Sequence, residues 1–525
     1  MATAEPAVVS TSRVESFLLQ GIEAVLCEVE VDLSSRGLTG TAMVGLPDAA
    51  VRESVDRVRT ALENSGFRYP WRRTTIGLAP GDLRKEGPVF DLPIAVAILA
   101  ADGAIEVESA VDESGKPRPS RLGRCMFAGE LSLDGRLRPV RGATSLALLA
   151  RRRGRTAVVV PSANAAEAAT VDGIAVYGFD RLEEVVAFLN RAARPSPTAT
   201  VEAESLLGEA IAEIDLGEIR GQESAKRALA IAAAGSHNLL LMGPAGAGKT
   251  MMARALPGLL PPMTREEALE VTRIHSCAGL LSGGRSLVCA RPVRSPHHTA
   301  STAAIVGGGR VPRPGEVSLA HRGVLFLDEL PEFSRSVLES LREPLEDGRI
   351  TIARAHGATS FPASVLLVAA MNPTQRGHRL DGARGRVEQD RYLARLSGPL
   401  VDRIDLHVEV TAVPFEQLAS RTLGRDTATL RAEVGRARAV AASRQGGGLA
   451  NAALKGRDLD RIVPLDSTCL GLLREAMESL GLSARAYDKI RRVTRTIADL
   501  DGAETPGVEH VAEAISYRVL DRTAT

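Results

Sequence analysis

A glycine-rich stretch near the middle of the chain has the residue types and the spacing that bind phosphate groups. It reads Gly243-Pro244-Ala245-Gly246-Ala247-Gly248-Lys249-Thr250 and lies between the apolar run 239–242 and a helix-prone segment. Glycines let consecutive backbone N–H groups turn toward phosphate oxygens, and the start of a helix adds partial positive charge. The ammonium of Lys249 can reach the β- and γ-phosphates, and the hydroxyl of Thr250 can bind Mg²⁺. The stretch therefore predicts a site for ATP and Mg²⁺.

Two carboxylates follow a second apolar run, 323–327, in the sequence Asp328-Glu329. We expect Asp328 to hold Mg²⁺, directly or through water, and Glu329 to polarise the attacking water. An apolar run that ends in Asp-Glu is weak evidence by itself. Downstream of a phosphate loop it is strong evidence, and the pair of motifs predicts ATP hydrolysis.

A third apolar run, 365–371, ends at Asn372-Pro373. We expect this run to form a strand between the other two, so that the amide of Asn372 can hydrogen-bond the γ-phosphate or the attacking water. The alternative is that Asn-Pro simply forms a turn. The strand pattern before it favours the sensing role.

The length and composition of the chain limit the number of domains that position these residues and the ways in which the chain can bind nucleic acid. The chain has 525 residues, which is too many for one core and predicts two to four domains. Net charge is +1, so contacts with nucleic acid would come from local basic patches. Aromatic residues make up 3% of the chain, which disfavours recognition built on base stacking.

The cysteine pattern and the hydropathy pattern predict a cytoplasmic protein. The five cysteines are scattered without any C-x-x-C pair, so neither a disulfide framework nor a zinc site is expected. No apolar stretch is long enough to span a bilayer, and no signal peptide is expected. We therefore expect no contact with a membrane.

Residues 1–190 alternate strand-like and helix-like patterns, which predicts a mixed α/β region. Strands are expected at 23–31, 72–78 and 157–161, and helices after Asp48 and over 92–99 and 181–190. The stretch 191–200 is rich in proline and small residues and has the composition of an interdomain linker.

One part of this region resembles the proteolytic domain of Lon-type proteases. The resemblance lies in Lys85-Glu86-Gly87-Pro88-Val89-Phe90-Asp91 and in 129–135. The position of the family's serine nucleophile is Val89 here, and the position of its lysine matches Thr144. Serine–lysine chemistry needs both groups, so we expect a protease-like fold without protease activity. The alternative is a tight turn that packs a helix against a sheet.

The phosphate loop, Asp328-Glu329, Asn372, 397–405 and 483–485 together resemble the AAA+ ATPases. More narrowly, 294–301, 396–410 and 483–500 resemble the magnesium-chelatase-like ComM/YifB family. This resemblance implies that Arg403 is an arginine finger and that Arg485 is a second nucleotide sensor. It also implies a homo-oligomeric ring, which we expect to be a hexamer. By spacing alone, a surface residue is the better explanation of either arginine.

The resemblance covers nearly the whole chain and implies its domain organisation. We expect an inactive Lon-protease-like α/β domain over 1–194 and a linker over 195–212. An AAA+ core with a parallel sheet is expected over 213–411. A small helical bundle over 412–525 completes the predicted α/β multidomain architecture, with helices near 430–441, 470–480, 487–498 and 508–519.

Members of this family are associated with branch migration of DNA during natural transformation, so DNA is an expected partner. Two basic loops, 307–315 and 347–357, supply candidate phosphate contacts, and the second reads as a hairpin. The candidates are Arg310, Arg313, Arg349 and Arg354. Ordinary loop arginines remain the alternative.

Many family members carry a cysteine-rich insertion after the sensor asparagine, and this chain departs from that pattern. The corresponding stretch, 374–395, has no cysteine and is rich in arginine, so zinc is not expected. These arginines either contact phosphate or belong to a solvated loop with its own acidic partners. His297 and His298 are expected to be structural or hydrogen-bonding groups and not metal ligands.

These features together predict a ring-forming AAA+ ATPase that couples ATP hydrolysis to the remodelling of DNA. The expected action is helicase-like branch migration on recombination intermediates. One alternative is a motor that remodels a protein partner, as the chelatase ATPase subunit does. Another is a nucleotide-switched scaffold with slow hydrolysis.

Overall fold

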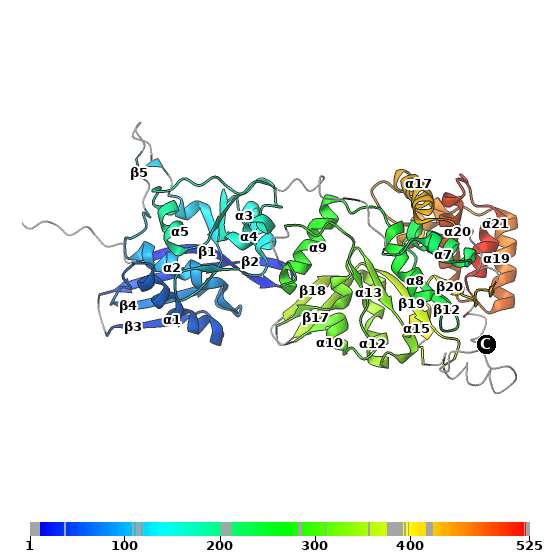
Figure 1. Cartoon of the computed structure of the whole chain (residues 1–525), viewed down its shortest axis with the longest axis horizontal. Coiled ribbons are helices and arrows are strands. Elements are labelled where there is room, and N and C mark those ends of the chain that lie inside the picture. The colour runs from blue at the N-terminus through cyan, green and yellow to red at the C-terminus, as the bar shows by residue number, and fades with distance from the viewer. Residues whose placement is uncertain are drawn as a thin grey trace, which may run out of the picture. The chain divides into compact units, whose positions relative to one another are not determined.

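The computed structural model of the chain forms two compact units (Figure 1). Unit 1 comprises Met1–Leu206 and Ala268–Val288, and unit 2 comprises Leu207–Glu267 and Cys289–Thr525. The sequence did not predict that the second segment of unit 1 clusters there. The structure describes residues 11–35, 38–107, 110–111, 117–118, 120–200, 208, 213–281, 286–309, 311–354, 357–374, 392, 395–396, 398–415, 424–518 and 520.

Unit 1 is built on a mixed seven-stranded sheet with the order β11-β10-β7-β1-β2-β4-β3. Its strands are β1 (Thr11–Gln20), β2 (Glu23–Ser34), β3 (Gly40–Val44), β4 (Arg73–Ala79), β7 (Cys125–Phe127), β10 (Ala157–Pro161) and β11 (Ala175–Phe179). β1 and β2 form an antiparallel hairpin, whereas β7, β10 and β11 run parallel. Two short ribbons pair β5 (Ala110–Val111) with β6 (Pro117–Arg118), and β8 (Glu130–Leu131) with β9 (Leu137–Arg138).

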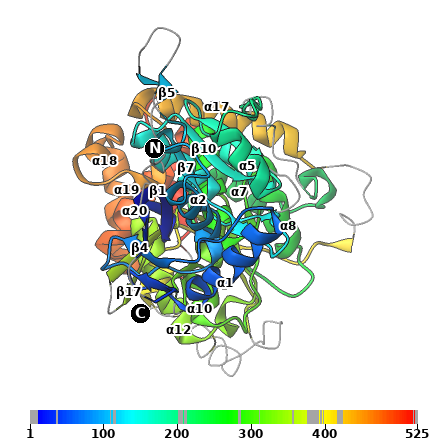
Figure 2. The ribbon, with the colours of Figure 1, turned by 90° about the vertical axis from the view of Figure 1, so that its left-hand side faces the viewer.

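Helices cover both faces of this sheet because alternate strand residues point in opposite directions. In β10, Val159 belongs to the apolar cluster that holds α1 (Ala49–Asn64), α2 (Asp91–Ala101) and α5 (Leu182–Leu189). Val158 and Val160 belong to the cluster that holds α3 (Ala143–Arg152) and α4 (Ser162–Ala168). The view in Figure 2 shows α1 and α2 beside one another in unit 1.

The predicted strands and helices of residues 1–190 are confirmed. Asp48 caps α1 by accepting a 2.8 Å hydrogen bond from the backbone N–H of Val51. Every residue of α2 is buried, as expected for its apolar run 92–101, and buried Asp91 at its start is paired with Arg57. Unit 1 also contains most of α9 (Arg265–Ala278), from Ala268 onward.

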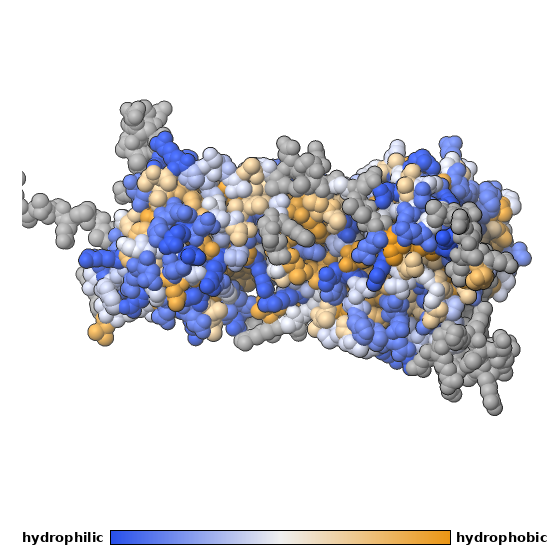
Figure 3. Space-filling model, viewed as in Figure 1, coloured by the Kyte–Doolittle hydropathy of each residue, from blue (hydrophilic) through white to orange (hydrophobic). Residues whose placement is uncertain are grey.

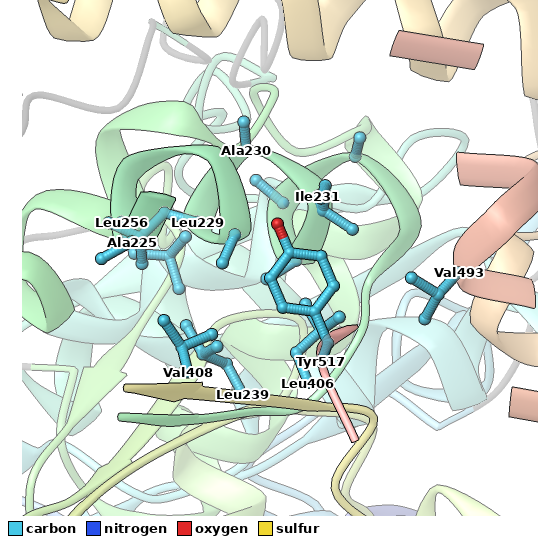
Figure 4. Packing of buried hydrophobic residues seen from close by; sticks show 14 of the residues in the cluster. Ala225, Leu229, Ala230, Ile231, Leu239, Leu256, Leu406, Val408, Val493 and Tyr517 are labelled. Atoms are coloured by element: carbon cyan, nitrogen blue, oxygen red, sulfur yellow. The ribbon is translucent and has the colours of Figure 1, made fainter. Parts of the chain in front are cut away.

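Unit 2 is built on a five-stranded parallel sheet with the order β13-β16-β19-β12-β20. The strands are β12 (Leu239–Met242), β13 (Val293–Arg294), β16 (Val324–Leu327), β19 (Leu366–Met371) and β20 (Leu406–Glu409). β12, β16 and β19 read as unbroken apolar runs because strands of a parallel sheet are buried on both faces. Figure 4 shows Leu239, Leu406 and Val408 packed beneath residues of α7 (Glu223–Gly235), with Tyr517 beside them.

The rest of unit 2 surrounds this sheet with short elements and a helical C-terminal region. The short elements are α8 (Lys249–Ala255), α10 (Thr302–Val306), β14 (Gly307–Gly308), β15 (Arg313–Pro314), α11 (Glu316–Leu319), α12 (Arg335–Ser340), α13 (Arg342–Asp347), β17 (Arg349–Arg354), β18 (Gly357–Pro362) and α15 (Gly398–Val401). The C-terminal helices are α17 (Thr427–Gln445), α18 (Gly456–Ile462), α19 (Ser467–Leu480), α20 (Ala484–Leu500) and α21 (Val508–Ser516), which confirms the predicted helical pattern.

The surface carries both hydrophilic and hydrophobic residues. On the face shown in Figure 3, hydrophilic and hydrophobic residues are interspersed over each unit. Within the described part of the chain, no helix is both long enough and apolar enough to cross a bilayer.

Candidate active site

The strand order of unit 2 brings the three sequence motifs to one edge of the sheet. β19 lies between β12 and β16, as expected from the sequence, and all three strands run in the same direction. The phosphate loop follows β12, Asp328-Glu329 follows β16, and Asn372 follows β19. Because the carboxyl ends of parallel strands meet at one edge, ligands of such sheets bind there.

The phosphate loop depends on glycine at positions where a side chain does not fit. A Cβ at Gly243 would lie 2.1 Å from the carbonyl oxygen of Val410, and Gly243 also donates its N–H to Met371 at 3.2 Å. Gly246 and Gly248 have φ angles of 79° and 91°, which residues with a side chain rarely adopt. The loop leads directly into α8, whose first residue is Lys249.

The ammonium of Lys249 is held by three oxygens. It donates to the carbonyls of Gly243 and Pro244 at 2.7 and 2.8 Å, and to Oδ1 of Asn372 at 3.1 Å. Its side chain is buried, and this burial lowers the pKa of Lys249, whereas Asp328 and Glu329 act in the opposite direction. The lysine thus links the phosphate loop to the end of β19.

Thr250 and Asp328 form the group suited to Mg²⁺. The hydroxyl of Thr250 donates to Oδ2 of Asp328 at 3.0 Å. A hydroxyl and a carboxylate in contact are the oxygen ligands that Mg²⁺ takes, together with water and substrate phosphates. Among the described residues, no group of three or more His, Cys, Asp or Glu side chains is arranged to hold a metal ion by itself.

Glu329 lies next to this pair with its side chain half exposed. Its backbone N–H donates to Oδ1 of Asp328 at 2.9 Å, and its own φ angle is 52°. This left-handed conformation is uncommon outside glycine and aims the residue away from the line of β16. Glu329 is therefore close to the Mg²⁺ candidates and still open to water.

The structure places His298 beside Glu329, a contact that the sequence did not predict. Nδ1 of His298 lies 3.3 Å from Oε2 of Glu329, and its ring stacks on that of His297 with centroids 4.1 Å apart. The two histidines follow β13, the edge strand next to β16. In the sequence, the feature that bears on this contact is that His297 and His298 follow the short strand β13.

Arg403 and Arg485 lie apart from this cluster. Arg403 donates to the carbonyl of Pro399 at 2.5 Å and pairs with Glu346. Arg485 is 64% exposed and lies 3.7 Å from Asp402. Among the described residues, neither arginine forms a hydrogen bond or an ion pair with the phosphate loop of its own chain.

A buried ion pair ties the helix that carries Arg485 to the segment that carries Arg403. Lys489, one turn after Arg485 on α20, lies 3.1 Å from Asp405 and donates to the carbonyl of Ile404 at 3.1 Å. Burial raises the pKa of Asp405, but Lys489 and His237 outweigh it and hold that pKa well below its usual range. Asp405 also accepts a 3.0 Å hydrogen bond from the backbone of Asn238, just before β12.

The arginines proposed for DNA contact lie on two ribbons. Arg313 is exposed in β15, and Arg349 is exposed at the start of β17. β17 and β18 form the predicted antiparallel hairpin, and Arg354 ends β17, although its side chain is not described. Arg310 lies outside the described residues, as does most of the arginine-rich stretch 374–395.

The positions compared with Lon-type proteases carry no nucleophile and no lysine. Val89 is apolar, and the hydroxyl and N–H of buried Thr144 donate to Oε1 of Glu167 at 3.2 and 3.0 Å. Ser276 of α9 donates to the same carboxylate at 2.5 Å. Glu167 therefore organises a structural hydrogen-bond network at this place.

Comparison with known proteins gives matches along most of the chain. Three family models match: "Subunit ChlI of Mg-chelatase" over residues 29–164, "Magnesium chelatase, subunit ChlI" over 215–418, and "Magnesium chelatase, subunit ChlI C-terminal" over 424–518.

Two individual proteins are similar to this chain over nearly the full length of both sequences, and a third is similar to part of it. The chain is 44% identical over 507 residues to competence protein ComM of Haemophilus influenzae, with 96% of each chain covered. It is 43% identical over 521 residues to the uncharacterized protein YifB of Escherichia coli, with 98% of each covered. A weaker similarity, 25% over 319 residues, links 57% of this chain to 84% of the Holliday junction branch migration complex subunit RuvB of Thermosipho melanesiensis. The chain therefore belongs to the magnesium-chelatase-like AAA+ ATPases of the ComM/YifB family.

Proposed function

We propose that the chain is a ring-forming ATPase that uses ATP hydrolysis to remodel DNA, through branch migration of recombination intermediates. The observation that carries the ATPase part is the convergence of Lys249, Thr250, Asp328, Glu329 and Asn372 at one edge of the sheet. The DNA part is supported by similarity to a competence protein and, more weakly, to a branch migration subunit.

Each group at this edge has a task in the proposed hydrolysis. Lys249 exchanges its carbonyl partners for phosphate oxygens and stabilises their charge. Thr250 and Asp328 would hold Mg²⁺, which would supply positive charge to stabilise the phosphates. Glu329 orients and polarises the attacking water, and Asn372 positions the γ-phosphate or that water. His298 holds Glu329 from the side of β13.

The two outlying arginines fit a ring in which neighbouring subunits share sites. Arg403 is proposed to stabilise transition-state charge on the nucleotide of the next subunit, and Arg485 to sense the nucleotide of its own subunit. The contacts of Arg403 with Pro399 and Glu346, away from the phosphate loop of its own chain, support its assignment to the next subunit. We further propose that residues 1–194 have a protease-like fold without protease activity, because Val89 and Thr144 replace the required pair.

We expect hydrolysis to depend on Glu329 and to be stimulated by DNA. Steady-state ATP hydrolysis is measured without DNA and with single-stranded, duplex and four-way-junction DNA. Stimulation should be greatest with junction or single-stranded DNA, and Glu329→Gln should lower turnover about 100-fold or more while ATP still binds, because general-base catalysis is lost. Hydrolysis that is indifferent to every DNA form would instead support a motor acting on a protein partner.

Arg403→Ala should lower ATP turnover about 10³-fold, the low end of arginine-finger effects, and leave ATP binding intact. The surface variant Arg461→Ala is the control, since the side chain of Arg461 is exposed on α18 and pairs with neighbouring Asp458. Mixing Arg403→Ala with Lys249→Ala subunits should recover part of the activity, because intact phosphate loops then meet intact fingers. Absence of any recovery in mixed rings would contradict action between subunits.

The ribbon arginines separate a DNA motor from its rivals. Arg313→Ala with Arg349→Ala should abolish DNA stimulation and leave the basal hydrolysis rate unchanged, because these side chains are exposed. Exposed arginines on α18 and α19 supply the control, Arg457→Ala with Arg474→Ala. If DNA stimulation survives the ribbon substitutions, the assignment of these arginines to DNA is wrong.

A further inference from the structure

Trp71 is the single tryptophan of the chain, and 69% of it is exposed. Several other large aromatic side chains of unit 1 are buried, namely Phe17, Phe90, Phe127, Phe179 and Phe188. An indole left in water forgoes the stabilisation that its burial would supply, and its exposed ring surface is open to a ligand. It lies in the loop that joins α1 to β4, whose labels mark the place in Figure 1.

The loop is anchored on both sides of Trp71. Phe67 donates its N–H to the carbonyl of Leu62 at the end of α1, at 3.0 Å. Tyr69 is buried, and its hydroxyl lies 2.8 Å from that of Thr41 on β3. The N–H of Arg72 donates to the carbonyl of Pro70 at 2.9 Å, which closes a three-residue turn with Trp71 at its centre. The indole is therefore presented by a fixed backbone.

The surroundings of the indole are basic. The guanidinium of Arg59 lies 4.4 Å from the centroid of the Trp71 ring, and Arg59 also lies 3.6 Å from Glu63. The segment 67–73 contains Arg68, Arg72 and Arg73 and has no acidic residue. Arg68 and Arg73 are exposed, and no carboxylate among the described residues forms an ion pair with any of the three.

We propose that Trp71 with Arg59, Arg68, Arg72 and Arg73 forms a platform for single-stranded nucleic acid. The unpaired arginines hold backbone phosphates, and the indole stacks on an unpaired base, which is the combination that proteins use for single strands. A duplex supplies the phosphates but hides the base faces, so the platform prefers single strands. The inference rests on the proposed function in taking DNA as the partner, and it adds a site for the strand in unit 1.

Because Trp71 is the only tryptophan, its fluorescence reports on this platform alone. We expect a 20-nucleotide oligo-dT to quench that fluorescence at saturation in the full chain without ATP. An abasic strand of equal length should bind more weakly and leave the fluorescence unchanged. Trp71→Ala should weaken the binding of labelled oligo-dT about fivefold or more, as stacking effects elsewhere suggest.

The arginines are tested through salt dependence. Replacing Arg68, Arg72 and Arg73 by Ala should make the slope of log affinity against log salt shallower by about 2, since each phosphate contact on a single strand contributes about 0.7. The control removes the same charge from unit 1 at arginines that have surface ion pairs, Arg136→Ala, Arg138→Ala and Arg152→Ala, and should leave the slope unchanged.

The outcomes separate this inference from the proposed function. Quenching that persists in Lys249→Ala supports the platform whatever the hydrolysis assay shows. DNA-stimulated hydrolysis with no quenching of Trp71 overturns the platform and leaves the motor standing. Equal quenching of Trp71 fluorescence by heparin and by oligo-dT overturns base stacking, because heparin has no bases. Quenching by an acidic peptide but not by oligo-dT overturns the nucleic-acid platform and indicates that a protein binds this surface.

Discussion

The parallel alignment of β12, β19 and β16 is the constraint on which the candidate site depends. Each strand is an apolar run buried on both faces, and each ends in the polar residues that act together. With β19 in the middle, Lys249 donates a hydrogen bond to Asn372 after β19, and Thr250 donates one to Asp328 after β16. A change in strand order would leave the same motifs intact and separate their side chains.

The C-terminal helices are tied to this sheet by buried charge. Lys489 and Asp405 form an ion pair in the interior, and Asp402 lies near Arg485, so two ion pairs join the start of α20 to the segment 402–405. Loss of one buried partner leaves an uncompensated charge, which is strongly destabilising. The proposed finger Arg403 therefore lies in a segment whose position depends on the helix that carries the proposed sensor.

Much of the site could be predicted from sequence because its chemistry is local. The phosphate loop, Asp328-Glu329 and Asn372 each follow a recognisable strand, and the central place of β19 is confirmed. The contacts of His298 with Glu329 and of Ser276 with Glu167 could not be predicted, since they join segments distant in the chain. The low aromatic content of the chain did not indicate that Trp71 is exposed, because a composition averaged over the chain does not show where one aromatic residue lies.

Equilibrium binding of a fluorescent ATP analogue, with and without Mg²⁺, tests the central claim most directly. Glu329→Gln should bind the analogue, and Mg²⁺ should tighten that binding. Lys249→Ala should bind about tenfold or more weakly, as expected for loss of a charged hydrogen bond, and Asp328→Asn should lose the effect of Mg²⁺. Equal affinity in all variants, with no response to Mg²⁺, would contradict a nucleotide site at this edge of the sheet.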